Sequence, residues 1–231
     1  GGKAVDRALQ AVTSEFDRAK TFYFGQQKKT SRTRAQEGTD YFATPEPLGQ
    51  KMVEWAGIEP GTDVLEPSAG HGAIARWFPE SAKRTVVEPS AELSSRLMLV
   101  TDAKLRNHLF EKLDVVNKYD SVIMNPPFGK GGKTAMEHLE KAFRHLRRNG
   151  RIVAIVPDGP SMQKRLDAFF DYDEKASLVP VLRREITLPD VAFERAGTNV
   201  NGKVLIIDAA DRQTLHDKGL EPSSRIELDN A

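Results

Sequence analysis

The stretch Asp63–Gly72, which reads DVLEPSAGHG, decides the fold class of this chain. Its apolar start predicts a short buried strand, and its glycine-rich end predicts a tight turn before a helix at 73–78. Glycines after a first strand let the backbone approach a ligand closely, and the start of the next helix offers free N–H groups. Glu66 precedes the turn, so a ligand with a positive charge is favoured over a pyrophosphate. The alternative is a purely structural turn in another kind of α/β protein.

Outward from this stretch, predicted strands alternate with predicted helices. One helix begins where the Thr44 hydroxyl can cap it with Pro45 at the first helical position. Another begins at a capping box of Thr134 and Glu137 and ends at Asn149-Gly150. This alternation predicts a parallel sheet covered on both faces, with ligand-binding residues at the carboxyl ends of the strands. The remaining strands are expected at 85–90, 121–124, 151–157, 184–188 and 204–208, and the remaining helices at 91–100 and 163–170.

Length and composition set the frame for this fold. The chain has 231 residues, of which 39% are hydrophobic and 29% charged, and these values are typical of a globular domain with a full core. We expect an amphipathic helix and a basic arm at 1–40, a core domain at 41–210 and a polar tail at 211–231. The absence of cysteine excludes disulfides and a cysteine-ligated zinc site. No apolar stretch is long enough to cross a bilayer, so a cytoplasmic location is expected.

A second unusual strand end lies in Tyr119–Thr134, which reads YDSVIMNPPFGKGGKT. Val122, Ile123 and Met124 predict a buried strand, but two prolines then stop it, because each proline lacks the N–H that a sheet needs. The turn Asn125–Phe128 therefore places a polar amide and an exposed aromatic ring at the carboxyl edge. Glu88 follows the strand at 85–90, where an acidic side chain can accept both hydroxyls of a ribose.

The order of these segments resembles the class I S-adenosylmethionine-dependent methyltransferases. More narrowly, it is similar to the DNA adenine-N6 group in which the cofactor motif precedes the catalytic motif. The matching motifs are the tetrapeptide Asn125-Pro126-Pro127-Phe128, the loop Glu66–Gly72, Glu88, and the segment Phe42-Ala43-Thr44-Pro45. The resemblance covers residues 41–208. It implies a Rossmann-like α/β fold with a mostly parallel seven-stranded sheet, helices on both faces and an antiparallel last strand.

The resemblance also implies roles for individual residues. Glu111 is the candidate for an acidic contact before the catalytic strand, with Asp114 as its rival, and Phe193 resembles a second aromatic clamp. Lys130 and Lys133 suit contacts with phosphates, although solvated loop lysines are the alternative. The expected contacts with S-adenosylmethionine are Phe42, Thr44, Pro45, Glu66, Pro67, Ser68, Ala69, Gly70, Gly72, Glu88, Pro89 and Glu111. The expected catalytic residues are Asn125, Pro126, Pro127 and Phe128, and the expected nucleic-acid contacts are Lys130, Lys133 and Phe193.

The chemistry of an exocyclic amine explains the tetrapeptide. The lone pair of the adenine amine is delocalised into the ring, so the amine is a poor nucleophile. Two acceptors, the Asn125 side-chain oxygen and the Pro126 carbonyl, can pull on its N–H bonds and aim the lone pair at the methyl group. Phe128 is expected to stack on the base, which must be flipped out of a duplex or already single-stranded. Neither a metal nor a covalent nucleophile is required.

Other substrates stay open at this point. An RNA methyltransferase acting on guanine N2 or adenine N6 is the nearest rival, although the guanine enzymes are expected to carry histidine where Gly129 stands. A non-catalytic module that binds nucleic acid is the second alternative. The tail at 211–231 is too short for a separate target-recognition domain, so we expect low sequence specificity on DNA. This compact form resembles the methyltransferase domains of phages and mobile elements that protect DNA from restriction.

Overall fold

The computed structural model describes residues 43–171, 176–188 and 201–217. The helix and basic arm expected at 1–40 lie outside these ranges, as do Phe42 and Phe193. Within them the elements in chain order are α2 (Glu46–Ala56), β1 (Asp63–Glu66), η1 (Ala75–Trp77), β2 (Lys83–Val87), α3 (Ala91–Leu97), β3 (Lys104–Arg106), η2 (Phe110–Lys112), β4 (Tyr119–Met124), η3 (Lys130–Gly132), α4 (Lys133–His145), β5 (Leu146–Pro157), α5 (Pro160–Phe170), β6 (Leu178–Thr187), β7 (Gly202–Asp211) and α7 (Arg212–Asp217).

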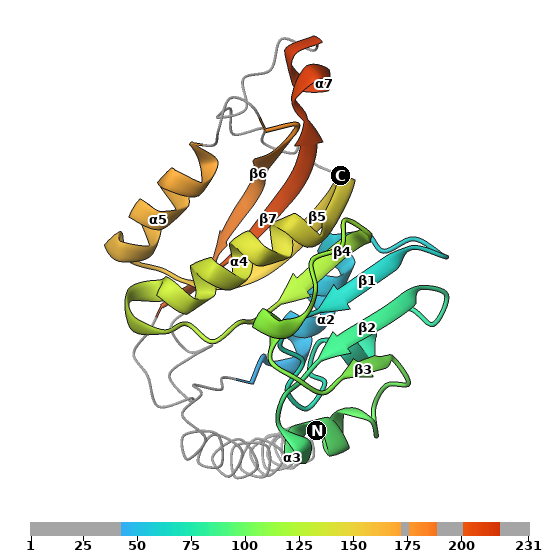
Figure 1. Ribbon diagram of the computed structural model, residues 1–231. Helices are drawn as coiled ribbons and strands as arrows, with labels where there is room; N and C mark the ends of the chain where they lie inside the picture. The colour runs from blue at the N-terminus through green and yellow to red at the C-terminus, as the bar shows by residue number, and fades with distance from the viewer. Residues whose placement is uncertain (1–42, 172–175, 189–200, 218–231) are drawn as a thin grey trace, which may run out of the picture.

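The strands form one sheet in the order β3-β2-β1-β4-β5-β7-β6 (Figure 1). The pairs from β3 to β5 are parallel, and β7 runs antiparallel to both β5 and β6. The prediction of a seven-stranded, mostly parallel sheet with an antiparallel last strand is therefore confirmed. The order reverses between β1 and β4, so the carboxyl ends of these two strands flank the switch point where ligands bind in open α/β sheets.

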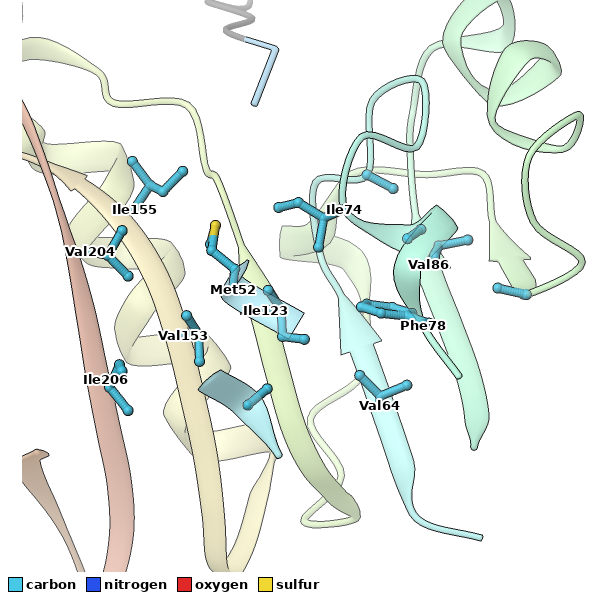
Figure 2. Packing of buried hydrophobic residues seen from close by; sticks show 14 of the residues in the cluster. Met52, Val64, Ile74, Phe78, Val86, Ile123, Val153, Ile155, Val204 and Ile206 are labelled. Carbon is cyan, nitrogen blue, oxygen red and sulfur yellow. The ribbon is translucent and has the colours of Figure 1, made fainter. Parts of the chain in front are cut away.

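Alternate residues of each strand pack on opposite faces of the sheet. Val64, Ile123 and Val153 face α2 and η1, and Figure 2 shows Met52 of α2 among the side chains of this face. Val122 and Ile152 face the other way, toward α4 and α5. Both faces are covered, and fully burying an aliphatic side chain of this size contributes roughly 1.5–3 kcal/mol. The sheet is thus a rigid platform for the loops at its carboxyl edge.

Several predicted helix ends are wrong. Helix α2 begins at Glu46 with Pro45 in the cap position, and no side chain caps it, so Thr44 is not its cap. Helix α4 is preceded by Gly132 in a left-handed conformation and begins at Lys133 without a side-chain cap, so the capping box does not form. It ends at His145, before Asn149-Gly150, because the chain enters β5 at Leu146.

Three further elements differ from the expectation. The helix expected at 73–78 is only a 3-10 turn, η1. Strand β3 was missed, because Lys-Leu-Arg contains a single apolar residue and shows no alternation. The segment expected as a polar tail begins with helix α7, whose Leu215 is buried against Val179 and Val181 of β6. Residues 218–231 lie outside the described part of the chain.

Candidate active site

The glycine-rich loop after β1 adopts a conformation that only glycine tolerates easily. Gly70 and Gly72 have φ angles of 57° and 93°. A Cβ at Gly72 would lie 2.5 Å from a methyl carbon of Val100 and 3.0 Å from one of Leu97, so the loop also packs tightly on the end of α3. The Ala69 N–H donates to the Val87 carbonyl at 3.0 Å and fixes the loop beside the end of β2.

Glu88 joins the loops that follow the first three strands. Its side chain is completely buried, and its two carboxylate oxygens accept hydrogen bonds from the Gly70 and Ser90 N–H groups, each at 2.8 Å. The Asn107 side chain, directly after β3, donates to the Glu88 carbonyl at 2.7 Å. The Ser90 hydroxyl accepts from the Leu93 N–H and caps α3. The sequence prediction missed Ser90 and Asn107, and Asn107 would have been found as a strand-end residue had β3 been recognised.

Glu66 is a buried carboxyl at the end of β1. It is 2% exposed, and burial raises its pKa well above the ordinary value of 4.5, with the nearby Glu88 raising it further. A hydrogen bond from the Ala75 N–H acts in the opposite direction. Among the described residues, its Oε2 atom has no hydrogen-bond partner. A buried acceptor of this kind suits a ligand that brings a positively charged donor.

Helix α2 is held close to the same loop. A Cβ at Gly49 would lie 2.5 Å from the Ala73 carbonyl oxygen, so only glycine permits this approach. Arg76 of η1 binds both the Glu46 carboxylate, at 2.5 Å, and the Gly72 carbonyl, at 3.2 Å. The start of α2 and the glycine-rich loop therefore form one packed unit.

The turn after β4 places Asn125 at the switch point. The Asn125 Nδ2 atom donates to Thr44 Oγ1 at 3.1 Å, although 81 positions separate the two residues in the chain. Thr44 is 3% exposed, so this hydrogen bond is shielded from solvent. Beyond the prolines, Gly129 has a φ of 67° and a Cβ there would overlap the side chain of Thr134. The Ala135 N–H donates to the Phe128 carbonyl at 3.2 Å and fastens the turn to α4.

Phe128 corrects one expectation. An exposed ring was predicted, but Phe128 is 6% exposed and belongs to the core cluster that also contains Ala135 and Leu188. Apolar neighbours bury the ring because the turn folds back onto the start of α4. Stacking on a base would require these neighbours to move.

Glu111 is placed in η2 against α4. Its Oε1 atom lies 2.9 Å from His138 Nε2, and its carbonyl accepts from the Lys141 ammonium at 2.7 Å. Partial burial is the largest single influence on the pKa of Glu111 and raises it, but the hydrogen bond with His138, a backbone hydrogen bond and the charges of His138 and Lys141 together lower the pKa overall. Among the hydrogen bonds of the described residues, none joins Glu111 to the loops around Glu66 and Glu88.

The predicted phosphate contacts are exposed and lie just beyond the Asn125–Phe128 turn. Lys130 is in η3, and Lys133 begins α4 and pairs with Glu137 at 3.7 Å. Helix α5 packs on η3 and adds a cation that sequence reasoning missed, because Arg165 Nε donates to the Gly131 carbonyl at 3.2 Å. Nothing in the sequence placed Arg165 there, since 34 positions separate it from Gly131.

The remaining predicted cofactor contacts lie in the loops after β1 and β2 and ahead of α2. Pro67, Ala69 and Gly70 are buried, and Ser68 and Pro89 are partly exposed at the same loops, as is Pro45 ahead of α2. Within 43–171, 176–188 and 201–217 no cluster of three or more histidine, aspartate or glutamate residues could hold a metal ion. The same ranges contain no helix of the length and apolarity that a bilayer span requires.

Residues 59–177, just over half of the chain, match the family Methyltransferase small domain. The chain belongs to this family. Two curated relatives also match. The first is the tRNA (guanine(10)-N2)-dimethyltransferase of Methanothermobacter thermautotrophicus, 24% identical over 149 residues that cover 57% of this chain and 44% of the relative. The second is YbxB of Bacillus subtilis, 25% identical over 121 residues that cover 47% of this chain and 60% of the relative.

Solved structures share the fold at lower identity. A Listeria monocytogenes protein assigned to the class I S-adenosylmethionine-dependent methyltransferases aligns with a TM-score of 0.60 at 16% identity, over 81% of this chain and 65% of that one. The M protein of the type I restriction enzyme EcoKI aligns with a TM-score of 0.58 at 17% identity, over 74% of this chain and 44% of that one. TrmN from Thermus thermophilus aligns with a TM-score of 0.52 at 18% identity, over 71% of this chain and 48% of that one. This chain spans less than two thirds of the length of each of these relatives.

Family and fold identify the cofactor as S-adenosylmethionine, and the residues present fit it. The methionine part of this cofactor carries an ammonium group, which matches the buried Glu66 Oε2 atom that has no hydrogen-bond partner among the described residues. The ribose carries two hydroxyls, which match the buried Glu88 carboxylate beside the glycine-rich loop. Both carboxyl groups follow neighbouring parallel strands, as a ligand lying across the carboxyl edge requires.

Proposed function

We propose that this chain transfers a methyl group from S-adenosylmethionine to the N6 amine of adenine in DNA, with low sequence specificity. The observation that carries the proposal is the Asn125–Phe128 turn, which ends the central strand β4 next to the cofactor loops and whose amide is tied to Thr44. The motif and the Ala43-Thr44-Pro45 segment are the two features that favour the adenine group, and they are in direct contact.

The cofactor supplies the electrophilic methyl group, and the residues of this chain position it and prepare the amine. Glu88 holds the ribose hydroxyls, and Glu66 accepts from the ammonium group. The Asn125 Oδ1 atom and the Pro126 carbonyl each accept one N–H of the amine, so that its lone pair points toward the methyl group. Proline at 126 and 127 keeps the two acceptors in place because it fixes the backbone φ. Transfer would leave S-adenosylhomocysteine and a positively charged methylated nitrogen with two protons, and one of these protons then goes to solvent, since no titratable side chain is assigned to the turn.

The polar groups of a paired adenine face its partner strand, so the base has to leave the stack before Asn125 can reach it. Lys130, Lys133 and Arg165 lie around the loop that directly follows the catalytic turn, and exposed cations at this place suit phosphates next to an extruded nucleotide. Such contacts bind phosphates, which every DNA sequence carries. They therefore support broad methylation of DNA rather than recognition of one site.

A second candidate is methylation of a guanine N2 amine in RNA. It is favoured by the match to a tRNA guanine-N2 dimethyltransferase, 24% identical over 149 residues. The acceptors that would polarise an adenine amine can polarise a guanine N2 amine equally well, because both amines are conjugated with their rings. The presence of Gly129 directly after Phe128, together with the Ala43-Thr44-Pro45 segment, favours adenine over guanine.

Nucleoside analysis tests both candidates. The protein is incubated with isotopically labelled S-adenosylmethionine and either genomic DNA or total tRNA, and the digested nucleosides are identified by mass spectrometry. N6-methyladenine in DNA is the expected product, and Asn125→Ala is the control for background. Label found only as N2-methylguanine in RNA would replace the proposal with the second candidate. Binding of the cofactor without any methylated nucleoside would instead indicate a non-catalytic module.

Specificity needs its own measurement. Methylation is mapped across a library of random DNA sequences, where the proposal expects adenines to be modified in many contexts. Restriction of the product to one motif of four or more base pairs would contradict the expectation of low specificity while leaving the reaction itself intact.

A further inference from the structure

Thr44 occupies a position that its predicted role does not explain. It is neither a helix cap nor exposed at the carboxyl edge, but is 3% exposed with its hydroxyl oxygen 3.1 Å from Asn125 Nδ2. The bond brings together the segment ahead of α2 and the turn after β4. The proposed reaction depends on the orientation of the Asn125 side chain, which makes this contact.

An asparagine amide has two faces of opposite character. Its oxygen accepts hydrogen bonds and its nitrogen donates them, and a rotation of 180° about the last side-chain bond exchanges them. With the nitrogen toward the target amine, donors would face donors and the amine would gain no acceptor. In the structure Asn125 Nδ2 donates to the Thr44 hydroxyl, so Oδ1 lies on the opposite side of the planar amide.

We propose that Thr44 is a positioning residue that orients the Asn125 amide so that its oxygen, not its nitrogen, meets the substrate amine. This inference rests on the proposed function, and it replaces the cofactor contact that the sequence suggested for Thr44. If the amide turns freely, only the fraction of the protein with Oδ1 toward the substrate is competent for transfer, and the rate falls to that fraction of its full value.

The backbone around Thr44 is built to hold it still. Pro45 fixes the following φ at −56°, and its carbonyl accepts the first helical hydrogen bond from Gly49 at 2.9 Å. Gly49 in turn packs against the Ala73 backbone, and Glu46 pairs with Arg76. Thr44 is therefore rigidly attached to the glycine-rich loop.

Thr44→Val tests the inference, because valine keeps the shape of threonine and removes only the hydroxyl. Thr44→Ser is the matched variant, because it keeps the hydroxyl and loses only a methyl group. With saturating S-adenosylmethionine we expect Thr44→Val to lower kcat by about two- to tenfold, as the loss of one orienting hydrogen bond implies. Its Kd for the cofactor should stay within about twofold of wild type, and Thr44→Ser should recover most of the rate.

Exchange of the Asn125 side-chain amide protons with water gives a readout that is independent of activity. In isotope-labelled wild-type protein, the two Asn125 side-chain N–H signals should be well separated and protected from exchange with water. In Thr44→Val they should exchange faster, and in Thr44→Ser they should stay protected. Thermal unfolding of all three proteins shows whether any change comes from a general loss of the fold.

Three outcomes would overturn the inference. A cofactor Kd raised more than about tenfold with an unchanged kcat would make Thr44 a cofactor contact. Equal losses in the valine and serine variants would assign it to packing. Unchanged exchange of the Asn125 amide in Thr44→Val would show that the hydrogen bond does not hold the side chain. If the wild type methylates no base in DNA or RNA, the proposed function fails and this inference fails with it.

Discussion

The Glu88 carboxylate accepts the Gly70 N–H at 2.8 Å, and this hydrogen bond connects the loops after β1 and β2, to which we assign the cofactor. A carboxylate that binds a backbone N–H on one oxygen and the Ser90 N–H on the other has fixed geometry. Its lone pairs that remain can therefore accept the ribose hydroxyls without a large reorganisation of the site. The relationship makes Glu88 important both for the loop and for the ligand.

Glu88→Gln should weaken S-adenosylmethionine binding with little change in kcat at saturation. The substitution keeps the size of the side chain, but it removes the charge that strengthens its hydrogen bonds and turns an amide NH2 donor toward the Gly70 or the Ser90 N–H, and we expect a Kd about 10- to 100-fold higher. Calorimetric titration measures it. Glu92→Gln, at an exposed position of α3 where the carboxylate pairs with Arg96, is the control and should bind as wild type. A lowered kcat with an unchanged Kd would contradict the assignment.

Glu66→Gln should stabilise the protein without cofactor and weaken cofactor binding. Burial raises the pKa of Glu66, so the folded protein binds its proton more tightly than the unfolded chain. The carboxyl of the wild type therefore costs stability as pH rises through 4.5 toward the raised value, and glutamine removes this cost. Thermal unfolding at several pH values should show the variant above the wild type at neutral pH and the gap closing toward pH 4.5. Parallel curves would show that the pKa of Glu66 is the same in the folded and the unfolded protein.

Asn125→Ala should nearly abolish methyl transfer and spare cofactor binding. It removes one of the two acceptors for the substrate amine, and loss of such a group costs about 100- to 1000-fold in kcat. Single-turnover assays with bound cofactor measure the step directly, and calorimetric titration measures cofactor affinity. An Asn125→Ala protein with wild-type kcat would remove the catalytic role of the turn.

The sheet could be predicted from the sequence because its central strands are continuous apolar runs bounded by unusual residues. Val122, Ile123 and Met124 are completely buried, as the run before the prolines indicates. The motif residues at the strand ends were likewise visible, since chemistry at such positions depends on residue type and spacing. Strand β3 was invisible because it lies at the edge of the sheet, where one apolar residue is enough.

Contacts between distant segments were beyond sequence reasoning. Nothing in the local sequence says that Thr44 binds Asn125 instead of capping α2, because the hydroxyl can do either and tertiary packing decides. The same holds for Phe128, whose burial depends on how the turn folds back on α4. Arg165 reaches Gly131 only because α5 packs on η3.

His145→Gln should make the protein less sensitive to mild acid. Burial, together with the nearby Lys141 and Arg144, lowers the pKa of His145 from 6.5 to about 4. The histidine is neutral in the fold, whereas the unfolded chain takes up a proton below pH 6.5, so stability present above this value is lost as pH falls toward 4. The full effect, reached only below pH 4, is on the order of 3 kcal/mol, and about 2 kcal/mol of it falls between pH 7 and pH 5. Urea unfolding of both proteins at pH 7 and pH 5 measures it, and an equal loss in both would exclude His145 as the source.

Lys130→Glu and Arg165→Glu should weaken DNA binding in the same way for every sequence. Both cations are exposed beside the loop after the catalytic turn, and within the described residues neither pairs with a carboxylate in an ion pair. Each lost phosphate contact should reduce the slope of log affinity against log salt by about 0.9. Fluorescence anisotropy with labelled DNA at several salt concentrations measures this slope, and cofactor titration should give the wild-type Kd.

Lys104→Glu, on the edge strand β3, is the control for net charge. If Lys104→Glu lowers affinity and slope as much as the two test variants, the loop carries no specific phosphate contact and general attraction accounts for binding.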